Sequence, residues 1–231
     1  MDKIYYQLKL ISGFPFGTFV NFPAFNLFST SFIGHAREKS FIKKLEEQTG
    51  RGLSYLNQDH GSKIVYAKTR GNQGDGDGLI LENNLLGSVF TADCLPIIFA
   101  DMSGNQVAVV HAGWKGSLEG IALKAVELLK KDGAKEIVAA IGPCARSCCY
   151  EVQIDLYNKF LASWPREAPQ VFYKSNERIF LDLIRFHQLI LDGVVSNLYQ
   201  SSQCTICSRE YHSYRRDKTS FRQVSIVGRR I

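Results

Sequence analysis

Short apolar runs broken by Gly, Pro, Asn and Asp cover much of the chain, and segments with helical periodicity lie between them. Such runs predict strands, which we expect at residues 5–11, 14–28, 53–67, 97–100, 107–111, 136–141 and 223–227. Segments whose apolar residues recur on one helical face predict helices at 40–48, 118–129, 153–164 and 182–191. Hairpins therefore alternate with a βαβ-like crossover at 107–141. The pattern predicts an α/β (mixed α+β) fold.

A predicted β-hairpin within residues 91–116 carries the most promising chemistry. Its two apolar runs are separated by a polar segment, 101–105, with the composition of a hairpin loop. If the chain turns near Ser103, Cys94 and His111 lie within one or two rungs of each other, and cross-strand neighbours are roughly 5 Å apart. We therefore expect a thiol and an imidazole to meet at one end of this hairpin.

The residues around this pair favour a functional site. An isolated Cys is commonly a small buried apolar residue, and a His at a strand end is commonly hydrogen-bonded. Here, however, Asp93 lies beside the thiol, and Pro96 removes a hydrogen-bond donor where the strand begins. The glycines on both sides of Lys115, at 113 and 116, leave the backbone open to close approach by a ligand.

Composition limits the class of protein. The chain has 231 residues, of which 45% are hydrophobic, so it can bury a full core without a disulfide framework. Residues 1–10 carry charges where a secretory segment would be apolar, and no apolar run approaches the ~18 residues that span a bilayer. We therefore expect a cytoplasmic protein with no membrane partner, whose six cysteines are thiols.

The net charge of +6 agrees with anionic ligands but does not favour a nucleic-acid partner. Lys and Arg are spread along the chain, apart from two groups at 215–222 and 229–230. Scattered basic residues normally form a solvated surface. We therefore predict small-molecule partners and no nucleic acid.

His60, in a polar turn at 57–62, completes a candidate metal-binding set with Cys94 and His111. Two imidazoles and one thiolate suit zinc and leave a fourth position for water or substrate, as in catalytic zinc sites. Copper is the alternative metal. A blue-copper site usually has an axial Met, but Met102 at the hairpin tip lies about 25 Å along the strand from Cys94.

Two other segments have weaker signals. The Gly-rich segment 71–78 lacks the ligands of an EF-hand and the Lys of a Walker loop, so we expect a flexible loop near the site, with Asp75 or Asp77 as a polar contact. The remaining cysteines allow a structural zinc site, but only one pair has the spacing of a zinc knuckle. These cysteines are Cys144, Cys148, Cys149 and the Cys204-x-x-Cys207 pair.

Motifs over about residues 53–227 resemble those of the YfiH-type family, namely QDHG at 58–61, TADCLPI at 91–97, HAGWKG at 111–116, IGPC and CCYEV within 141–152, and SYRRD at 213–217. This family was first labelled laccase-like multicopper polyphenol oxidase and was later assigned purine nucleoside phosphorylase activity. The resemblance implies a layered single domain over residues 1–231, with mixed β-sheets flanked by helices, similar to the architecture of toxin-type cysteine hydrolases. It also implies that His60, Cys94 and His111 bind zinc, in a site that phosphorolyses adenosine, inosine and methylthioadenosine and also deaminates adenosine.

Phosphorolysis requires cations that bind phosphate and an electrophile or acid that helps the purine base to leave. Arg215 and Arg216 are candidates for phosphate, together with Lys115, because guanidinium binds phosphate through paired hydrogen bonds. A metal near the base, or Asp93 as a proton carrier, would assist departure of the base. Cys94, His111 and Asp93 are thus the catalytic candidates. The expected partners are a purine nucleoside and phosphate, bound by a monomer or weak homo-oligomer.

Three alternatives stay open. Without metal, Cys94 as nucleophile, His111 as base and His60 as accessory would make a cysteine hydrolase or amidase. A laccase-like copper oxidoreductase requires many imidazoles, and the chain has five histidines. The third is a binding protein that keeps the zinc pocket but turns over little substrate. The family's N-terminal Ser-Thr-Arg-x-Gly-Gly segment has its best counterpart here at 16–19, which lacks the Arg and the Gly pair.

Overall fold

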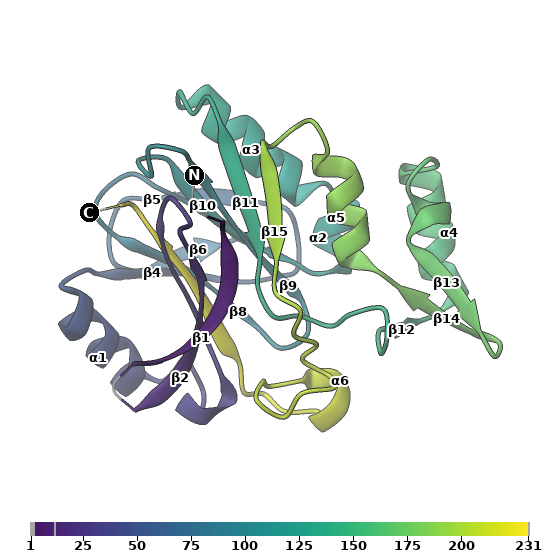
Figure 1. Ribbon diagram of the computed structural model, residues 1–231, viewed down its shortest axis with the longest axis horizontal. Coiled ribbons are helices and arrows are strands. Elements are labelled where there is room, and N and C mark those ends of the chain that lie inside the picture. The colour runs from purple at the N-terminus through teal and green to yellow at the C-terminus, as the bar shows by residue number, and fades with distance from the viewer. Residues whose placement is uncertain (1–2, 12, 231) are drawn as a thin grey trace.

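Strands and helices follow one another along the whole chain (Figure 1). The structure is a computed structural model, and it describes residues 3–11 and 13–230. The strands are β1 (Tyr5–Ile11), β2 (Phe14–Val20), β3 (Phe25–Ser29), β4 (Leu53–Asn57), β5 (Ile64–Ala67), β6 (Gly71–Asp75), β7 (Gly78–Leu81), β8 (Leu86–Thr91), β9 (Leu95–Asp101), β10 (Val107–Ala112), β11 (Ile137–Ile141), β12 (Glu151–Val152), β13 (Phe172–Ser175), β14 (Arg178–Leu181), β15 (Asn197–Gln200) and β16 (Gln223–Gly228). The helices are α1 (Lys39–Thr49), α2 (Trp114–Leu118), α3 (Ile121–Lys131), α4 (Ile154–Ser163), α5 (Leu183–Leu191) and α6 (Tyr214–Asp217), with short 3-10 helices at Ser31–Ile33 and Ala168–Gln170.

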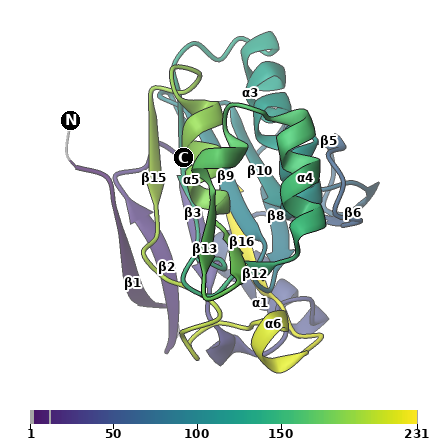
Figure 2. The same ribbon diagram turned by 90° about the vertical axis from the view of Figure 1, so that its right-hand side faces the viewer.

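Two large sheets pack face to face, and helices cover their outer faces (Figure 2). One sheet has seven strands in the order β1-β2-β3-β16-β8-β4-β6, and the other has six in the order β15-β11-β9-β10-β7-β5. A three-stranded sheet, β12-β14-β13, lies beside α4 (Figure 1). These layers confirm the predicted mixed class. Among the described residues, no helix has the length and apolarity needed to cross a membrane.

The β9–β10 hairpin lies in the middle of the six-stranded sheet and is buried on both faces. Ile97 and Phe99 pack with residues of α3 and α5, whereas Ile98 and Ala100 pack with the seven-stranded sheet. Because successive side chains of a strand point to opposite faces, this double burial requires a continuous apolar run. The register pairs His111 with Pro96, which confirms the predicted hairpin.

Helix α1 covers the outer face of the seven-stranded sheet. Its Leu45 is buried in a cluster with Leu53 of β4 and Phe90 of β8. The helix ends at Gly50, which has a φ of 65° and donates its N–H to the carbonyl of Glu46. A left-handed glycine is a common helix end, and the sequence prediction for this helix is therefore confirmed.

The helical segment after the hairpin is interrupted, which the sequence did not indicate. Helix α2 begins after Gly113, and Gly120, with a φ of 75°, separates it from α3. The helix was expected at 118–129, but Ser117 already lies buried within α2, where its Oγ is 3.0 Å from Nε2 of His187. Both helices place apolar residues against the same sheet, so the periodicity continues across the break.

The Gly-rich segment was expected to be a loop, and this is wrong for most of it. Gly71–Asp75 forms β6, which pairs in parallel with β4 at the edge of the seven-stranded sheet. Strands β4 and β5 enter different sheets, so the turn that carries His60 crosses from one sheet to the other. This crossing brings His60 to the end of the β9–β10 hairpin.

Candidate metal centre and adjoining cavity

Three side chains from separate segments converge at the end of the hairpin. His111 lies in β10, Cys94 directly precedes β9, and His60 lies between β4 and β5. Their ligand atoms, two ring nitrogens and one sulfur, all lie within 4.8 Å of one another. The two imidazole rings meet edge to face with centroids 4.8 Å apart. The structure therefore brings together the three residues that the sequence proposed as metal ligands.

A buried carboxylate, Asp77, positions two of these ligands. It accepts hydrogen bonds from the backbone N–H groups of Asp59, His60 and Gly61, at 3.3, 3.2 and 2.8 Å. Its Oδ1 also lies 2.6 Å from Nδ1 of His111. Because Nδ1 is engaged by the carboxylate, Nε2 is the ring nitrogen of His111 that remains for a metal. One side chain thus sets the turn of His60 and the ring orientation of His111.

The charges of Cys94, His111 and Asp77 depend on one another. Burial raises the pKa of Cys94, but the His111 imidazolium and hydrogen bonds from both rings outweigh burial and bring the pKa to about 6. Burial lowers the pKa of His111, but the Cys94 thiolate and Asp77 raise it to about 9. Burial also opposes ionisation of Asp77, yet the hydrogen bond from His111 helps to lower its pKa to about 2. The protein alone therefore favours a thiolate beside an imidazolium.

Two glycines allow the hairpin to approach the His60 turn. A Cβ on Gly113 would lie 3.2 Å from Sγ of Cys94 and 3.5 Å from Cδ2 of His60. A Cβ on Gly116 would lie 2.5 Å from the carbonyl oxygen of Gly61, closer than such atoms can pack. The bare backbone of this segment is thus a condition for the three ligands to meet.

A cavity of about 540 Å³ opens beside the ligand cluster, and all three ligands line it. This volume suits a small molecule. Cys94 is partly exposed toward it, whereas His111 is only 3% exposed. The rest of the lining includes aromatic side chains, namely Phe90, Trp114, Tyr150 and Tyr214, and basic ones, namely His35, Arg37, Arg215 and Arg222.

Asp93 lines the cavity, but its oxygens are occupied by hydrogen bonds. They accept from Oγ1 of Thr205 (2.7 Å), Oγ of Ser213 (3.0 Å) and the backbone N–H of Arg215 (2.7 Å). Its backbone has a φ of 88°, which is unusual for a residue with a side chain. Through these contacts Asp93 connects the segment that carries Cys94 to the C-terminal loops.

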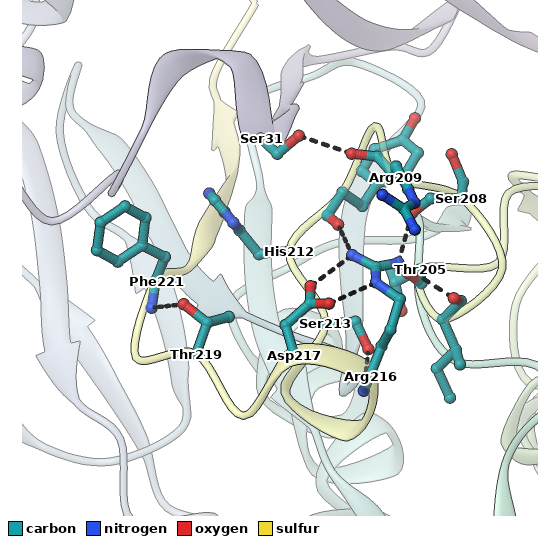
Figure 3. Close-up of polar contacts among 12 residues, drawn as sticks. Ser31, Thr205, Ser208, Arg209, His212, Ser213, Arg216, Asp217, Thr219 and Phe221 are labelled. Carbon is teal, nitrogen blue, oxygen red and sulfur yellow. Dashed lines mark hydrogen bonds and ion pairs between the residues drawn. The ribbon is translucent and has the colours of Figure 1, made fainter.

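Of the three predicted phosphate ligands, only Arg215 lines the cavity. Its guanidinium lies 5.3 Å from the centre of the Tyr150 ring, and its Nη1 donates to the carbonyl of Glu151. Lys115 is exposed on α2, away from the lining. Arg216 turns into the preceding loop, as Figure 3 shows, and donates to Asp217 and to the carbonyls of Thr205, Ile206, Ser208 and Tyr211. Lys115 and Arg216 therefore do not join the site.

Two other arginines of the lining were missed by the sequence analysis. Arg37 lies 4.6 Å over the centre of the Phe90 ring, and burial together with the charge of Arg222 lowers its pKa. Within the described residues, neither Arg37 nor Arg222 nor Arg215 forms an ion pair with a carboxylate. Arg222 belongs to the basic group at 215–222, which was a signal, whereas nothing in the local sequence distinguishes Arg37.

Comparisons with known proteins place the chain among characterised sequences. A family model described as multi-copper polyphenol oxidoreductase laccase matches residues 35–230. The chain belongs to this family. The Aquifex aeolicus purine nucleoside phosphorylase is 37% identical over 190 residues, which cover 80% of this chain and 87% of that protein. The Escherichia coli purine nucleoside phosphorylase YfiH is 32% identical over 142 residues, or 61% and 58% of the two chains.

Solved structures of this family show the same fold. The crystal structure of YlmD from Geobacillus stearothermophilus matches with a TM-score of 0.81 at 25% identity, over 94% of this chain and 96% of that chain. The expected YfiH-type resemblance is thus confirmed. The three ligands and the three arginines of the cavity all lie within the part that the family model matches, whereas β1, β2 and β3 precede it.

Proposed function

We propose that the protein is a zinc-dependent purine nucleoside phosphorylase. It would cleave adenosine, inosine or methylthioadenosine with phosphate and would deaminate adenosine as a side activity. The observation that carries the proposal is a three-ligand centre that opens into a cavity lined by three arginines, none of which forms an ion pair with a carboxylate of the described residues. The names of the Aquifex aeolicus and Escherichia coli relatives support the same reaction.

The donor set fits one zinc ion. His60, Cys94 and His111 offer two imidazoles and a thiolate, and Asp77 holds Nδ1 of His111 as carboxylates commonly hold the free ring nitrogen of histidines that bind zinc. When bound there, zinc supplies a Lewis acid at the wall of the cavity. The remaining histidines are engaged elsewhere: His35 accepts the backbone N–H of Arg222, and the rings of His187 and His212 lie against Ser117 Oγ and the Gly34 carbonyl. A multicopper centre would require these imidazoles as ligands.

Phosphate would bind to Arg37, Arg215 and Arg222. These arginines line the cavity, and in the part of the chain that the structure describes no carboxylate forms an ion pair with them, while the charges of Arg37 and Arg222 repel each other. A bound phosphate relieves this repulsion and accepts paired hydrogen bonds from planar guanidinium groups. Arg37 and Arg222 thus take the place that the sequence analysis gave to Arg216 and Lys115.

The nucleoside would lie between the arginines and the ligand cluster. Phe90, Trp114, Tyr150 and Tyr214 offer aromatic surfaces that suit a purine ring. In phosphorolysis the bond between C1′ and N9 breaks, a phosphate oxygen forms the new bond to C1′, and the departing base takes up a proton. The arginines would orient the attacking phosphate and stabilise its charge as this bond forms.

The test is an assay of the protein purified without chelator, with adenosine, inosine and methylthioadenosine, in the presence and absence of phosphate. Phosphorolysis predicts free base and ribose 1-phosphate, or its methylthio analogue, only when phosphate is present. Deamination predicts inosine and ammonia from adenosine in both conditions. Failure of the zinc-loaded protein to release base from any of these nucleosides would leave a binding role in place of the enzyme.

A metal-free cysteine hydrolase is the second candidate, and the lowered pKa of Cys94 is the observation that favours it. In protein stripped of metal, we expect alkylation of Cys94 to follow the thiolate fraction, with a midpoint near pH 6. Both candidates predict this reactivity. Only the hydrolase predicts that the stripped protein cleaves amides or esters and that added zinc abolishes the cleavage.

A further inference from the structure

Four of the other cysteines form a second cluster, separate from the mixed centre of His60, Cys94 and His111. The sulfurs of Cys148, Cys149, Cys204 and Cys207 all lie within 4.8 Å of one another. Within this set, Cys207 lies 3.0 Å from Cys149 and 3.6 Å from Cys148. The sequence allows a structural zinc site from these cysteines and Cys144, but only Cys204 and Cys207 have the spacing of a zinc knuckle.

Two loops that follow neighbouring parallel strands bring the four thiols together. One loop follows β11 and carries Cys148 and Cys149, and the other follows β15 and carries the Cys204-x-x-Cys207 turn. The strand pairing continues as a bridge between Cys144 and Cys204, with a hydrogen bond from the N–H of Thr205 to the carbonyl of Cys144. The backbone, and not chance contact of mobile side chains, therefore fixes the spacing between the loops.

We propose that these four cysteines bind a second zinc ion, in a closed four-thiolate site with a structural role. Zinc with four Cys ligands is tetrahedral with Zn–S distances of about 2.3 Å, which places the sulfurs about 3.8 Å apart. Four sulfurs already within 4.8 Å of one another need only small side-chain movements to reach this geometry. Four protein ligands leave no position for substrate, which distinguishes structural from catalytic zinc.

The surroundings of Cys204 match a metal ligand. The backbone amides of Cys207, Arg146 and Ile206 are directed at its sulfur, as hydrogen-bond donors around metal ligands commonly are. Cys204 is buried, while Cys148 and Cys207 are exposed, so an ion has a path from solvent. The backbone of Cys144 lies next to that of Cys204, but the buried sulfur of Cys144 is not among the four that gather.

The second ion would brace one wall of the cavity. The loop after β15 also carries Thr205, which donates a hydrogen bond to Asp93 beside Cys94. Carbonyl groups of the same loop accept hydrogen bonds from the guanidinium of Arg216 (Figure 3). On the other loop, Tyr150 follows Cys149 directly and lies under the guanidinium of Arg215. Binding at the four cysteines would thus hold in place residues that face substrate, without touching substrate itself.

The experiment is zinc analysis of the full chain purified without chelator. We expect two zinc ions per wild-type chain and one in the Cys149→Ser/Cys207→Ser double variant. Cys144→Ala is the matched control, because it removes a buried neighbouring thiol that is outside the set, and it should keep two. Cys94→Ala should keep one ion, so the result for the four cysteines does not depend on the mixed centre or on the proposed activity.

Cobalt in the Cys94→Ala variant gives a second measurement that leaves the four cysteines intact. We expect thiolate-to-cobalt charge-transfer absorption, together with the intense visible bands of a tetrahedral site. Absence of these bands would overturn the proposal, as would a double variant that folds and still holds two zinc ions. Titration of thiols in denatured, unreduced protein with chelator should find all six cysteines. A count of four would show a disulfide in place of the metal site.

Discussion

The two cysteine-containing clusters differ in donors, surroundings and connection to solvent. The mixed centre has two imidazoles and one sulfur, borders a cavity and is held by the buried carboxylate of Asp77. The four-cysteine cluster has sulfur donors only and joins two loops, and none of its four residues lines the cavity. A protein that needs reactivity at one ion and rigidity at another can obtain both from the number and type of ligands.

The difference predicts opposite consequences for activity and stability. Removing a ligand of the mixed centre should abolish chemistry while the fold survives, because the ligands lie at the ends of well-packed strands. Removing a ligand of the four-cysteine cluster should loosen the loops first and reduce activity only through them. The variants below test this contrast, from the largest expected effect to the smallest.

Cys94→Ala should have the largest effect. We expect loss of the mixed-centre ion and a fall in kcat/KM for phosphorolysis of about 10³-fold or more, because several kcal/mol of transition-state stabilisation come from such an ion. The thermal midpoint should change little. Steady-state kinetics, zinc analysis and thermal melts measure the three quantities, and Cys207→Ser is the contrasting variant, with a lower melting temperature and a smaller kinetic loss. A reversed order of these effects would contradict the comparison.

Asp77→Asn should weaken zinc binding at the mixed centre about 10–100-fold, because carboxylates that hydrogen-bond to metal-bound histidines have effects of this size. The loss follows from removal of the charge next to Nδ1 of His111. A competition titration with a chromophoric chelator measures the affinity. Asp93→Asn is the matched control, because its carboxylate is bonded but contacts neither imidazole. Equal weakening by both variants would count against a specific role for Asp77.

His187 belongs to neither cluster and should govern the acid sensitivity of the core. Burial lowers its pKa to about 3, against about 6.5 in the unfolded chain, and its Nδ1 has no hydrogen-bond partner within the described residues. The unfolded state therefore takes up the proton first as pH falls, and stability is lost between about pH 6.5 and 3 and is constant above. We expect a loss of about 2 kcal/mol from pH 7 to pH 5.

Urea unfolding at several pH values, with chelator present throughout, measures this slope. His187→Gln removes the titrating group and keeps a polar side chain, so its free energy of unfolding should depend less on pH by the same amount. A slope that is unchanged in His187→Gln would assign the acid sensitivity to other groups.

Arg215→Ala should raise the KM for phosphate about 10-fold, which corresponds to about 1.4 kcal/mol, with a smaller change for the nucleoside. Arg216→Ala provides the contrast, since this neighbour donates to backbone carbonyls and should lower thermal stability instead. Initial rates over a range of phosphate concentrations, combined with thermal melts, separate the two outcomes. A higher phosphate KM in Arg216→Ala alone would contradict the placement of these side chains.

The sequence was sufficient for the parts of the site that depend on local pattern. The apolar runs and the polar turn of β9 and β10 fixed how Cys94 and His111 face each other, because hairpin register follows from loop length and burial. His60 could be proposed as a third ligand only from its residue type and its polar turn, because its position depends on a turn that crosses between the two sheets. Asp77 was predicted only as one of two possible polar contacts, because its role depends on three backbone amides of that turn that point to it.

Long-range contacts account for what the sequence did not reveal. Arg37 and Arg222 meet at one cavity from distant parts of the chain, and the cysteine pairs meet only because β11 and β15 are neighbours. Arg215 and Arg216 are adjacent, and neighbours on a helical turn point in different directions, so their sequence could not say which one faces the cavity. Strand β6 was concealed because glycines can pair through the backbone alone.

The contact between position 116 and the carbonyl of Gly61 bears on any attempt to redesign this protein for new substrates. A library that varies the aromatic and basic side chains of the cavity leaves the contact between Gly116 and Gly61 unchanged. Even a methyl group at 116 would displace the peptide next to His60. We therefore expect substitution of Gly116 to disturb the metal centre from a position that does not line the cavity.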